Sequence, residues 1–249
     1  MAMDELEGRV AVVTGAASGI GLAIAGALSS ERMTVVMADI DADALANAVG
    51  PLRAAGAMVD AVELDVRDPI AVDEVARRVV DRHGALHVAV NNAGIVNRGN
   101  SWELPLEEWH RVLDVNLWGV IHGVRSFVPC ILDTGDEGHV VNVASMAAVL
   151  PLDRLGPYTV AKHGVLGLSD VLRAELREMG APVGVSTVMP GRVKTGMNPI
   201  GTVDPAAVAT NVIDAIRSGR EYVFTDGQSA AAVQGRLQAI IAARADVLG

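Results

Sequence analysis

Three polar residues, Ser145, Tyr158 and Lys162, have the types and the spacing that proton-transfer chemistry requires. Tyr158 and Lys162 are four residues apart, so on a helix their side chains lie on the same face. A phenol has a pKa of about 10, and a nearby ammonium group favours the phenolate and lowers that pKa. Ser145 follows an apolar run, where its hydroxyl could hold a substrate oxygen beside the phenol. The set indicates general acid–base catalysis, with a solvated lysine beside a half-buried tyrosine as the alternative.

A glycine-rich segment near the N-terminus could bind a phosphate group. It reads Thr14-Gly15-Ala16-Ala17-Ser18-Gly19-Ile20-Gly21, after an apolar run and at the start of a helical pattern. Glycines at this spacing permit a tight turn and a close approach of the backbone to a pyrophosphate, which the first N–H groups of the helix would bind. No Lys-Ser or Lys-Thr pair follows, which disfavours the loop typical of ATP-binding proteins. A glycine-rich turn without a nucleotide is the alternative.

The carboxylate of Asp39 ends the second apolar run, 18 residues after Gly21. A carboxylate there can accept hydrogen bonds from both hydroxyls of an adenosine ribose and would repel a 2′-phosphate. No Arg or Lys occurs in residues 40–43, so the sequence predicts NAD rather than NADP as the cofactor. In the alternative interpretation Asp39 and Asp41 only cap the next helix, and Asp41 is expected to do so.

Other candidate cofactor contacts also follow predicted strands. Asp65 and Val66 come after the third strand, where a side chain could meet an adenine edge. The segment Asn92-Ala93-Gly94 has small residues that would let a cofactor approach closely, and its amide could tie neighbouring strands together. Asn116 lies in an apolar helical stretch, so a buried partner is expected for its amide. A last set could close over a nicotinamide: Pro190, Gly191, Val193 and Thr195.

Short apolar runs alternate with helical patterns along the whole chain. The predicted strands cover 9–14, 34–38, 57–64, 87–91, 138–144, 183–189 and 221–225, and the predicted helices 19–31, 41–55, 69–83, 105–133, 157–179 and 205–218. This order predicts an α/β fold with a doubly wound parallel sheet of about seven strands and helices on both faces. Ligands of such a sheet bind beyond the carboxyl ends of its strands, where the strand-end motifs lie. A single domain, 1–249, is expected.

Composition limits the classes of function. The chain of 249 residues has a net charge of −10 and no cluster of Lys and Arg, which argues against nucleic acid or an anionic membrane as a partner. Its single cysteine excludes an internal disulfide and fits a reducing compartment. No secretory signal is visible, and no uncharged apolar run reaches the roughly 18 residues needed to span a bilayer. The six histidines are not paired with Cys or carboxylates in a way that would bind a metal. The sequence therefore predicts a cytoplasmic protein without a metal site.

In their order along the chain, these motifs resemble those of the short-chain dehydrogenase/reductase family. The matching residues span roughly 8–196 and comprise Thr14-Gly15-x-x-x-Gly19-Ile20-Gly21, Asn91-Asn92-Ala93-Gly94, Asn116, Ser145, Tyr158-x-x-x-Lys162 and Pro190-Gly191. The resemblance implies a Rossmann fold, an NAD or NADP cofactor, and transfer of a hydride between the nicotinamide and a substrate carbon.

The resemblance also implies a role for each polar residue. Tyr158 would be the general acid/base, and Ser145 would hold the substrate oxygen. Lys162 would bind the nicotinamide-ribose hydroxyls and lower the pKa of Tyr158, and Asn116 would hold a water that links Lys162 to solvent. We expect an NAD-dependent alcohol dehydrogenase. An NADPH-dependent carbonyl or 3-oxoacyl reductase is the alternative among enzymes, and a dinucleotide-binding regulator is the alternative without turnover.

The substrate is expected to contact apolar residues after the fourth and fifth strands and after Thr195. The candidate substrate residues are Ile95, Val96, Met146, Leu152, Leu155 and Met197. Their side chains predict a secondary alcohol or ketone with a largely apolar body. Residues 195–215 are expected to move as a lid over the site.

The chain continues beyond the last predicted strand, and residues 229–249 are expected to form a C-terminal helical extension. One face of this helix is apolar, with Val233, Leu237, Ile240 and Ile241 at helical spacing. Docking on the domain or on a partner subunit is expected, because Arg236 and Arg244 are too few for a membrane-surface helix. The family resemblance implies a homodimer formed through the helices at 105–133 and 157–179, or a homotetramer.

Overall fold

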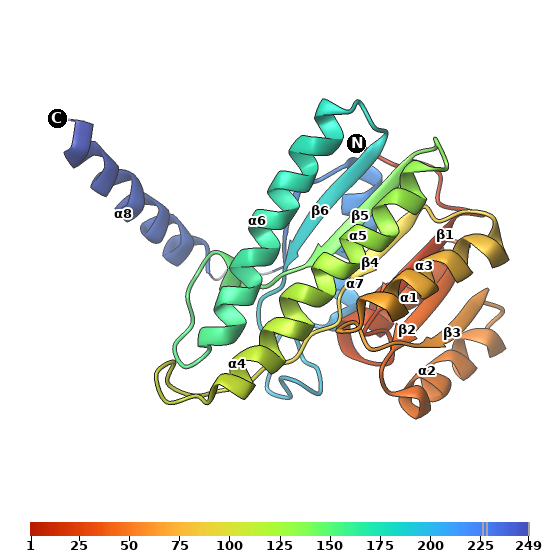
Figure 1. Cartoon of the computed structure of the whole chain (residues 1–249), viewed down its shortest axis with the longest axis horizontal. Helices are drawn as coiled ribbons and strands as arrows, with labels where there is room; N and C mark the ends of the chain where they lie inside the picture. Colours follow the sequence, from red (N-terminus) through yellow and green to blue (C-terminus); the bar gives the residue numbers. More distant parts are fainter. Residues whose placement is uncertain (226, 228, 249) are drawn as a thin grey trace.

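The structure is a computed structural model that describes residues 1–225, 227 and 229–248. Its centre is a parallel seven-stranded sheet with the strand order β3-β2-β1-β4-β5-β6-β7 (Figure 1). The strands are β1 (Val10–Thr14), β2 (Thr34–Asp39), β3 (Val59–Glu63), β4 (Val88–Asn91), β5 (Gly138–Val143), β6 (Val183–Met189) and β7 (Tyr222–Phe224). The predicted α/β fold is confirmed, and each predicted strand overlaps one of these.

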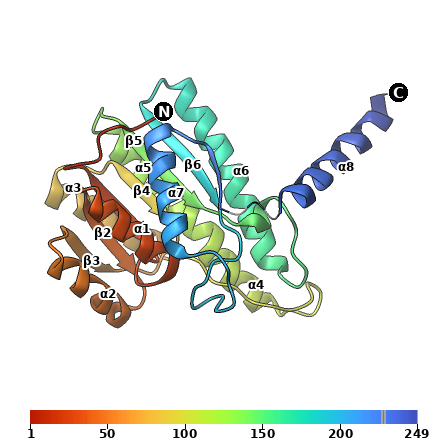
Figure 2. The same cartoon turned by 180° about the vertical axis from the view of Figure 1, so that it is seen from behind.

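Helices cover both faces of the sheet, as Figures 1 and 2 show from opposite sides. On one face lie α1 (Gly19–Ser30), α2 (Ala42–Ala54) and α7 (Pro205–Ser218); on the other lie α3 (Pro69–His83), α5 (Gly119–Leu132) and α6 (Gly156–Glu178). Ala11 and Val13 of β1 pack in the first core, and Val10 and Val12 pack in the second. Both faces of a central strand are thus buried, which explains its uninterrupted apolar sequence.

The strand order reverses at β1. This strand pairs in parallel with β2 on one side and with β4 on the other. The connections to the two neighbours therefore run over opposite faces of the sheet, and a crevice between them is expected at the carboxyl ends. The motifs at the ends of β1, β2 and β4 are brought together there.

The helix predicted over 105–133 is not continuous. The structure divides it into α4 (Leu106–Leu113), a π-helical turn η1 (Asp114–Trp118) and α5. Asn116 lies in the π-helical turn and is fully buried. By length and composition, Leu106–Leu132 resembles a membrane span, but 44% of its apolar window is buried inside the domain.

The residues of the predicted lid, 195–215, are divided between a loop and the helix α7. Its second half belongs to α7, in which Val208, Ala209 and Val212 are buried. The preceding residues 192–203 form a folded-back loop, because Thr202 and Val203 both donate backbone hydrogen bonds to the carbonyl of Arg192. The packing of α7 in the core disfavours movement of 205–215, and the lid itself stays a prediction.

A helix, α8 (Ala230–Leu248), follows the sheet as predicted. In both views most of it projects away from the domain (Figures 1 and 2). Val233 packs against the domain, but Leu237, Ile240 and Ile241 are 50%, 56% and 68% exposed. The predicted apolar face is thus only partly covered by the domain itself.

The N-terminal segment packs near the amino ends of β5 and β6. The backbone N–H of Met3 donates to the carbonyl of Ile216, and the Met3 side chain is fully buried. Beside this segment His139 of β5 is fully buried, with Nε2 2.8 Å from the hydroxyl of Ser186. That hydroxyl donates to the carbonyl of Arg220, so Nε2 carries the proton that His139 donates. Burial lowers the pKa of His139 to about 3.

Candidate active site

The predicted acid–base residues meet at the end of β5. Ser145 is the N-cap of a short 3₁₀ turn, η2 (Met146–Ala148), and its Oγ accepts a hydrogen bond from the N–H of Ala147 at 3.1 Å. Tyr158 and Lys162 lie in the first turns of α6. The Lys162 Nζ donates to the carbonyl of Val143 at 2.8 Å and lies 5.7 Å from the centroid of the Tyr158 ring. The structure thus places an ammonium, a phenol and a hydroxyl side by side.

Burial controls the charge of both titratable groups. It raises the pKa of Tyr158, and a hydrogen bond with Ser145 opposes that shift. It lowers the pKa of Lys162 to about 8, because only 3% of this residue is exposed. The net shift of Tyr158 is therefore opposite to the one predicted. The physical reason is that desolvation of the phenolate outweighs its stabilisation by neighbouring groups.

Asn116 connects the π-helical turn to the segment after β4. Its Oδ1 accepts from the N–H of Ile95 and its Nδ2 donates to the carbonyl of Ile95, each at 2.8 Å. A Cβ on Gly94 would lie 3.3 Å from Asn116 Oδ1 and 3.7 Å from Lys162 Nζ. The amide therefore fixes the backbone next to Lys162. The water predicted beside Asn116 stays a prediction.

The glycine-rich turn has room only for glycine at its key positions. A Cβ on Gly21 would lie 2.1 Å from the carbonyl oxygen of Gly15 and 2.5 Å from the Asn92 side chain. Gly15 and Gly19 have φ angles of 64° and 55°, which side-chain-bearing residues rarely adopt. Ser18 stands at the N-cap of α1 and, within the described chain, caps no backbone N–H with its side chain. The first N–H groups of α1, which includes Ile20, are left for an anionic ligand.

Thr14 fastens this turn to the end of β4, a role that the sequence did not reveal. Its Oγ1 accepts hydrogen bonds from the N–H groups of Asn92 and Ala93 at 2.9 and 3.1 Å. The Asn92 amide in turn donates to the carbonyls of Thr14 and Gly15. The predicted tie between neighbouring strands is present, and it holds the glycine turn in place.

Asp39 joins the glycine turn to the start of α2. Its carboxylate accepts from the N–H of Ala17 at 2.9 Å and from the N–H of Asp41 at 3.1 Å. Asp41 also caps α2 by accepting from Ala44, as predicted. The two carboxylate oxygens of Asp39 have further lone pairs for ribose hydroxyls. A glycine cradle, uncapped helix amides and a carboxylate at the next strand end together fit a dinucleotide.

The predicted adenine contacts have neighbours that the sequence analysis missed. The guanidinium of Arg67 binds the Asp65 carboxylate through Nε and Nη2, and this pairing lowers the pKa of Asp65. His122 of α5 lies with Nδ1 2.9 Å from the carbonyl of Val66. A Cβ on Gly119 would lie 2.7 Å from the Val66 side chain. The adenine end is therefore supported by α5, whose His122 is 56 residues from Val66 in the sequence, and no local pattern connects the two.

The segment after β6 lies over the glycine turn. The carbonyl of Pro190 accepts from the N–H of Met146, next to Ser145, and the N–H of Gly191 donates to Thr225. Val193 is buried. Thr195 reaches the turn, because a Cβ on Gly19 would lie 3.0 Å from its methyl group. These predicted contacts therefore share the strand ends with the acid–base residues.

The candidate substrate residues fall into three groups by exposure. Met146 and Leu155 are buried, and Leu155 lies in a bridge with Gly99. Ile95 and Val96 are partly buried after β4. Leu152 and Met197 are 39% and 48% exposed on their loops. The assignment of these residues to substrate binding stays a prediction.

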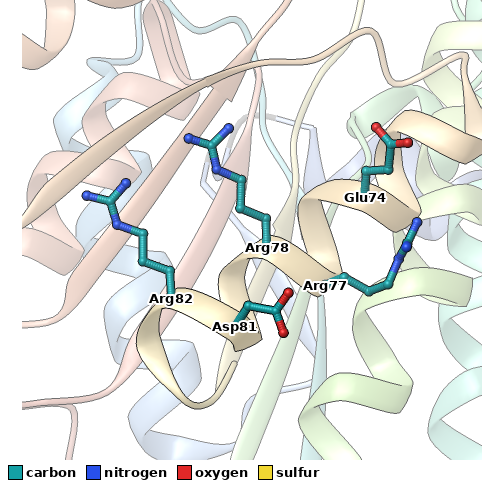
Figure 3. Close-up of a pocket in the computed structure, with 5 residues that line it drawn as sticks. All are labelled: Glu74, Arg77, Arg78, Asp81 and Arg82. Carbon is teal, nitrogen blue, oxygen red and sulfur yellow. The ribbon is translucent and has the colours of Figure 1, made fainter.

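A cluster of charged side chains lies on α3, apart from the strand ends. Figure 3 shows a shallow depression on the surface of α3, lined by Glu74, Arg77, Arg78, Asp81 and Arg82. All five side chains come from one helix, and Arg82 pairs with Asp60 at 3.0 Å. Among the residues that the structure describes, no group of three or more His, Cys, Asp or Glu could hold a metal ion.

Comparisons with known proteins agree with this geometry. Residues 9–202 match the family described as short chain dehydrogenase. The chain is 42% identical over 236 residues to the 1-deoxy-11-beta-hydroxypentalenate dehydrogenase of Streptomyces avermitilis. The match covers 90% of this chain and 87% of that protein.

Solved structures agree as well. A short-chain dehydrogenase/reductase from Burkholderia phymatum, in complex with NAD, has a TM-score of 0.93 and 36% identity, covering 96% of both chains. A variant of the actinorhodin polyketide ketoreductase, with NADPH, has a TM-score of 0.83 and 31% identity, covering 90% of this chain and 98% of that one.

Proposed function

The chain belongs to the short-chain dehydrogenase/reductase family, and from this premise we propose that it interconverts secondary alcohols and ketones with NAD. The protein is an oxidoreductase with a Rossmann fold that transfers a hydride between a nicotinamide cofactor and an alcohol or ketone. The preference for NAD, the apolar substrate and the roles of the individual residues are the parts that we propose.

In the proposed mechanism Tyr158 carries the proton. When bound, the nicotinamide supplies or accepts the hydride. The Tyr158 hydroxyl would give a proton to the carbonyl oxygen in reduction, and the Tyr158 phenolate would take the proton of the alcohol in oxidation. In both directions Ser145 would donate a hydrogen bond to that substrate oxygen. One observation supports this above all: the phenol, the Ser145 hydroxyl and the buried Lys162 ammonium meet at the end of β5.

Lys162 and Asn116 have supporting roles in this proposal. Lys162 would bind the ribose hydroxyls next to the nicotinamide, and its positive charge would stabilise the phenolate of Tyr158 during turnover. Asn116 would keep the backbone of Ile95 in place, as its two hydrogen bonds indicate. Its water would carry protons between Lys162 and solvent.

The proposed preference for NAD depends on Asp39. Its carboxylate would bind the hydroxyls of the adenosine ribose and would repel the 2′-phosphate of NADP. The nearby cation Arg67 is paired with Asp65, so it is not free to attract that phosphate. An NADPH-dependent carbonyl or 3-oxoacyl reductase is the second candidate, since one structural neighbour is a ketoreductase with NADPH.

A panel of aliphatic, cyclic, aryl and steroidal secondary alcohols tests this function directly. We expect the reduced nicotinamide to appear with NAD, and faster with substrates that have an apolar body. Its absorbance is the measurement, with NADP as the comparison. A marked preference for NADP would overturn the role of Asp39 and favour the second candidate.

The Tyr158→Phe variant tests the mechanism. Loss of the hydroxyl removes the proton carrier, so kcat should fall about 100-fold or more, while the Kd for NAD stays nearly unchanged. Tyr222→Phe is the matched control, because the other tyrosine of the chain binds Asp170 through its hydroxyl on β7. Undiminished turnover by Tyr158→Phe would contradict the assigned role.

The assembly and the compartment are also proposed. Exposed apolar side chains on η1 and α6, namely Trp118, Val160 and Val171, support a homodimer formed through this layer. A homotetramer is the alternative, and light scattering distinguishes the two. We also propose a cytoplasmic location, which the single cysteine of the chain fits.

A further inference from the structure

One arginine connects the C-terminal helix to both segments that carry the acid–base residues. Arg236 of α8 is the only charged residue in the sequence from 227 to 243. Its Nη1 donates to the carbonyl of Val149 at 2.8 Å, and its Nη2 lies 3.2 Å from Nε2 of His163. Val149 ends the turn that begins at Ser145, and His163 follows Lys162 in α6. We name these three residues the Arg236 clasp.

The hydrogen-bonding roles in the Arg236 clasp are consistent with one another. Nδ1 of His163 lies 2.9 Å from the carbonyl of Thr159, which can only accept, so Nδ1 carries the proton. In the tautomer with the proton on Nδ1, Nε2 has a free lone pair. A guanidinium can only donate, so this lone pair is the acceptor that Arg236 requires. The orientation of His163 is therefore set by α6 itself to receive Arg236.

Apolar packing supports the same attachment. Val233 precedes Arg236 by three residues, so the two side chains lie on one face of α8. Val233 packs against a cluster that includes Ala144 and Met146, the two residues that flank Ser145. Beyond the clasp Leu237 and Ile240 are exposed, and the rest of α8 projects from the domain in Figures 1 and 2. The first turns of α8 are thus the part that is attached.

We infer that Arg236 is a positioning residue for the substrate side of the active site. By holding the Val149 carbonyl it fixes the turn that carries Ser145 and the candidate substrate residue Met146. By holding His163 it ties that turn to the helix of Tyr158. The glycine turn and Asp39, which would bind the pyrophosphate and the adenosine ribose, lie on other elements, so we expect the affinity for NAD to depend little on the clasp. This inference rests on the proposed function, because it assigns the substrate to the Ser145 side.

The variant Arg236→Met tests the clasp, since it keeps the length of the side chain and removes the donors. We expect the KM for an alcohol with an apolar body to rise about tenfold, with kcat changed less and the Kd for NAD unchanged. Arg244→Met is the matched control on the exposed part of α8 and should change neither constant. Arg236→Lys keeps one charged donor and should restore part of the affinity.

A second readout does not need turnover. Hydrogen exchange at the amides of residues 146–150 should become faster in Arg236→Met and stay unchanged in Arg244→Met, with the melting temperature as a check on folding. Equal exchange in both variants would refute the clasp. A rise in KM for the alcohol and in the Kd for NAD together would refute its selectivity for the substrate side. If exchange changes as expected but no alcohol is oxidised by the wild-type enzyme, the proposed function fails and the clasp stands.

Discussion

Burial acts in opposite directions on the two titratable residues of the site. It raises the pKa of Tyr158 and lowers that of Lys162 to about 8, because an apolar environment favours the neutral form of each. Near neutral pH the phenol therefore keeps its proton, as does most of Lys162. Tyr158 is then prepared to donate a proton, as reduction requires, whereas oxidation needs the phenolate.

This difference predicts the pH dependence of the two directions. In oxidation, kcat/KM for the alcohol should rise with pH. The rise should be about tenfold per pH unit below the pKa that Tyr158 has in the enzyme–NAD complex. In reduction, kcat/KM should be flat near neutrality and fall at alkaline pH. Initial rates in both directions between about pH 6 and about pH 10 are the measurement. An oxidation rate that does not vary over this range would contradict a proton-carrying phenol.

The elements of the fold follow from local sequence patterns, but the contacts between them do not. Apolar runs and helical periodicity predicted all seven strands and placed the strand-end motifs at the carboxyl ends. The pattern at 105–133 gave no sign of the π-helical turn, because the partner of Asn116 is Ile95, 21 residues away. The pairing of Arg67 with Asp65 depends on a turn conformation, and hydrophobic periodicity carries no information about it. The sequence predicted the helix α8. It did not predict that only the first turns of this helix, through Val233 and Arg236, contact the domain.

Substitution of Gly21 by alanine tests the contact between α1 and the glycine turn. The new Cβ would lie 2.1 Å from the backbone oxygen of Gly15, so the turn would have to shift. We expect the Kd for NAD to rise about tenfold or more and the protein to lose about 1–3 kcal/mol of stability. Titration with NAD and thermal unfolding measure the two effects.

Gly26→Ala is the matched control in the same helix. A Cβ there would lie 3.9 Å from a side-chain atom of Leu52, an ordinary contact distance. This change should leave NAD binding intact and raise stability by up to about 1 kcal/mol, because alanine favours the helix. Similar behaviour of the two variants would show that crowding at Gly21 is not the cause.

The stability of the whole molecule depends on residues far from the active site. His139 is fully buried at the opposite ends of the strands, and its pKa is lowered to about 3 by burial first and by the N-terminal ammonium second. The unfolded chain would bind a proton at this residue near pH 6.5. Between these values the unfolded state binds more protons than the folded one, so stability falls as the pH falls.

His139 should therefore contribute to acid sensitivity, together with His87, whose pKa is also lowered by burial. From about pH 6.5 to about pH 3, His139 should reduce the free energy of unfolding by about 1.4 kcal/mol per pH unit, up to about 5 kcal/mol. His139→Gln, which can still donate to Ser186, should flatten this dependence. Urea unfolding at about pH 7 and about pH 4.5 measures it. His110→Gln, at an exposed position, is the control, and an equal slope in both variants would contradict the assignment.

The two backbone bonds of Asp39 give that residue a second duty with a practical consequence for redesign. Replacing Asp39 so that the enzyme binds NADP would also remove the two hydrogen bonds that connect the turn after β1 to the start of α2. The variant would lose its preference for NAD and this local support of the fold together. Its low activity could then be attributed wrongly to poor binding of NADP. A successful redesign should first install a neutral acceptor at this position, such as serine or asparagine, and only then add a cation for the phosphate.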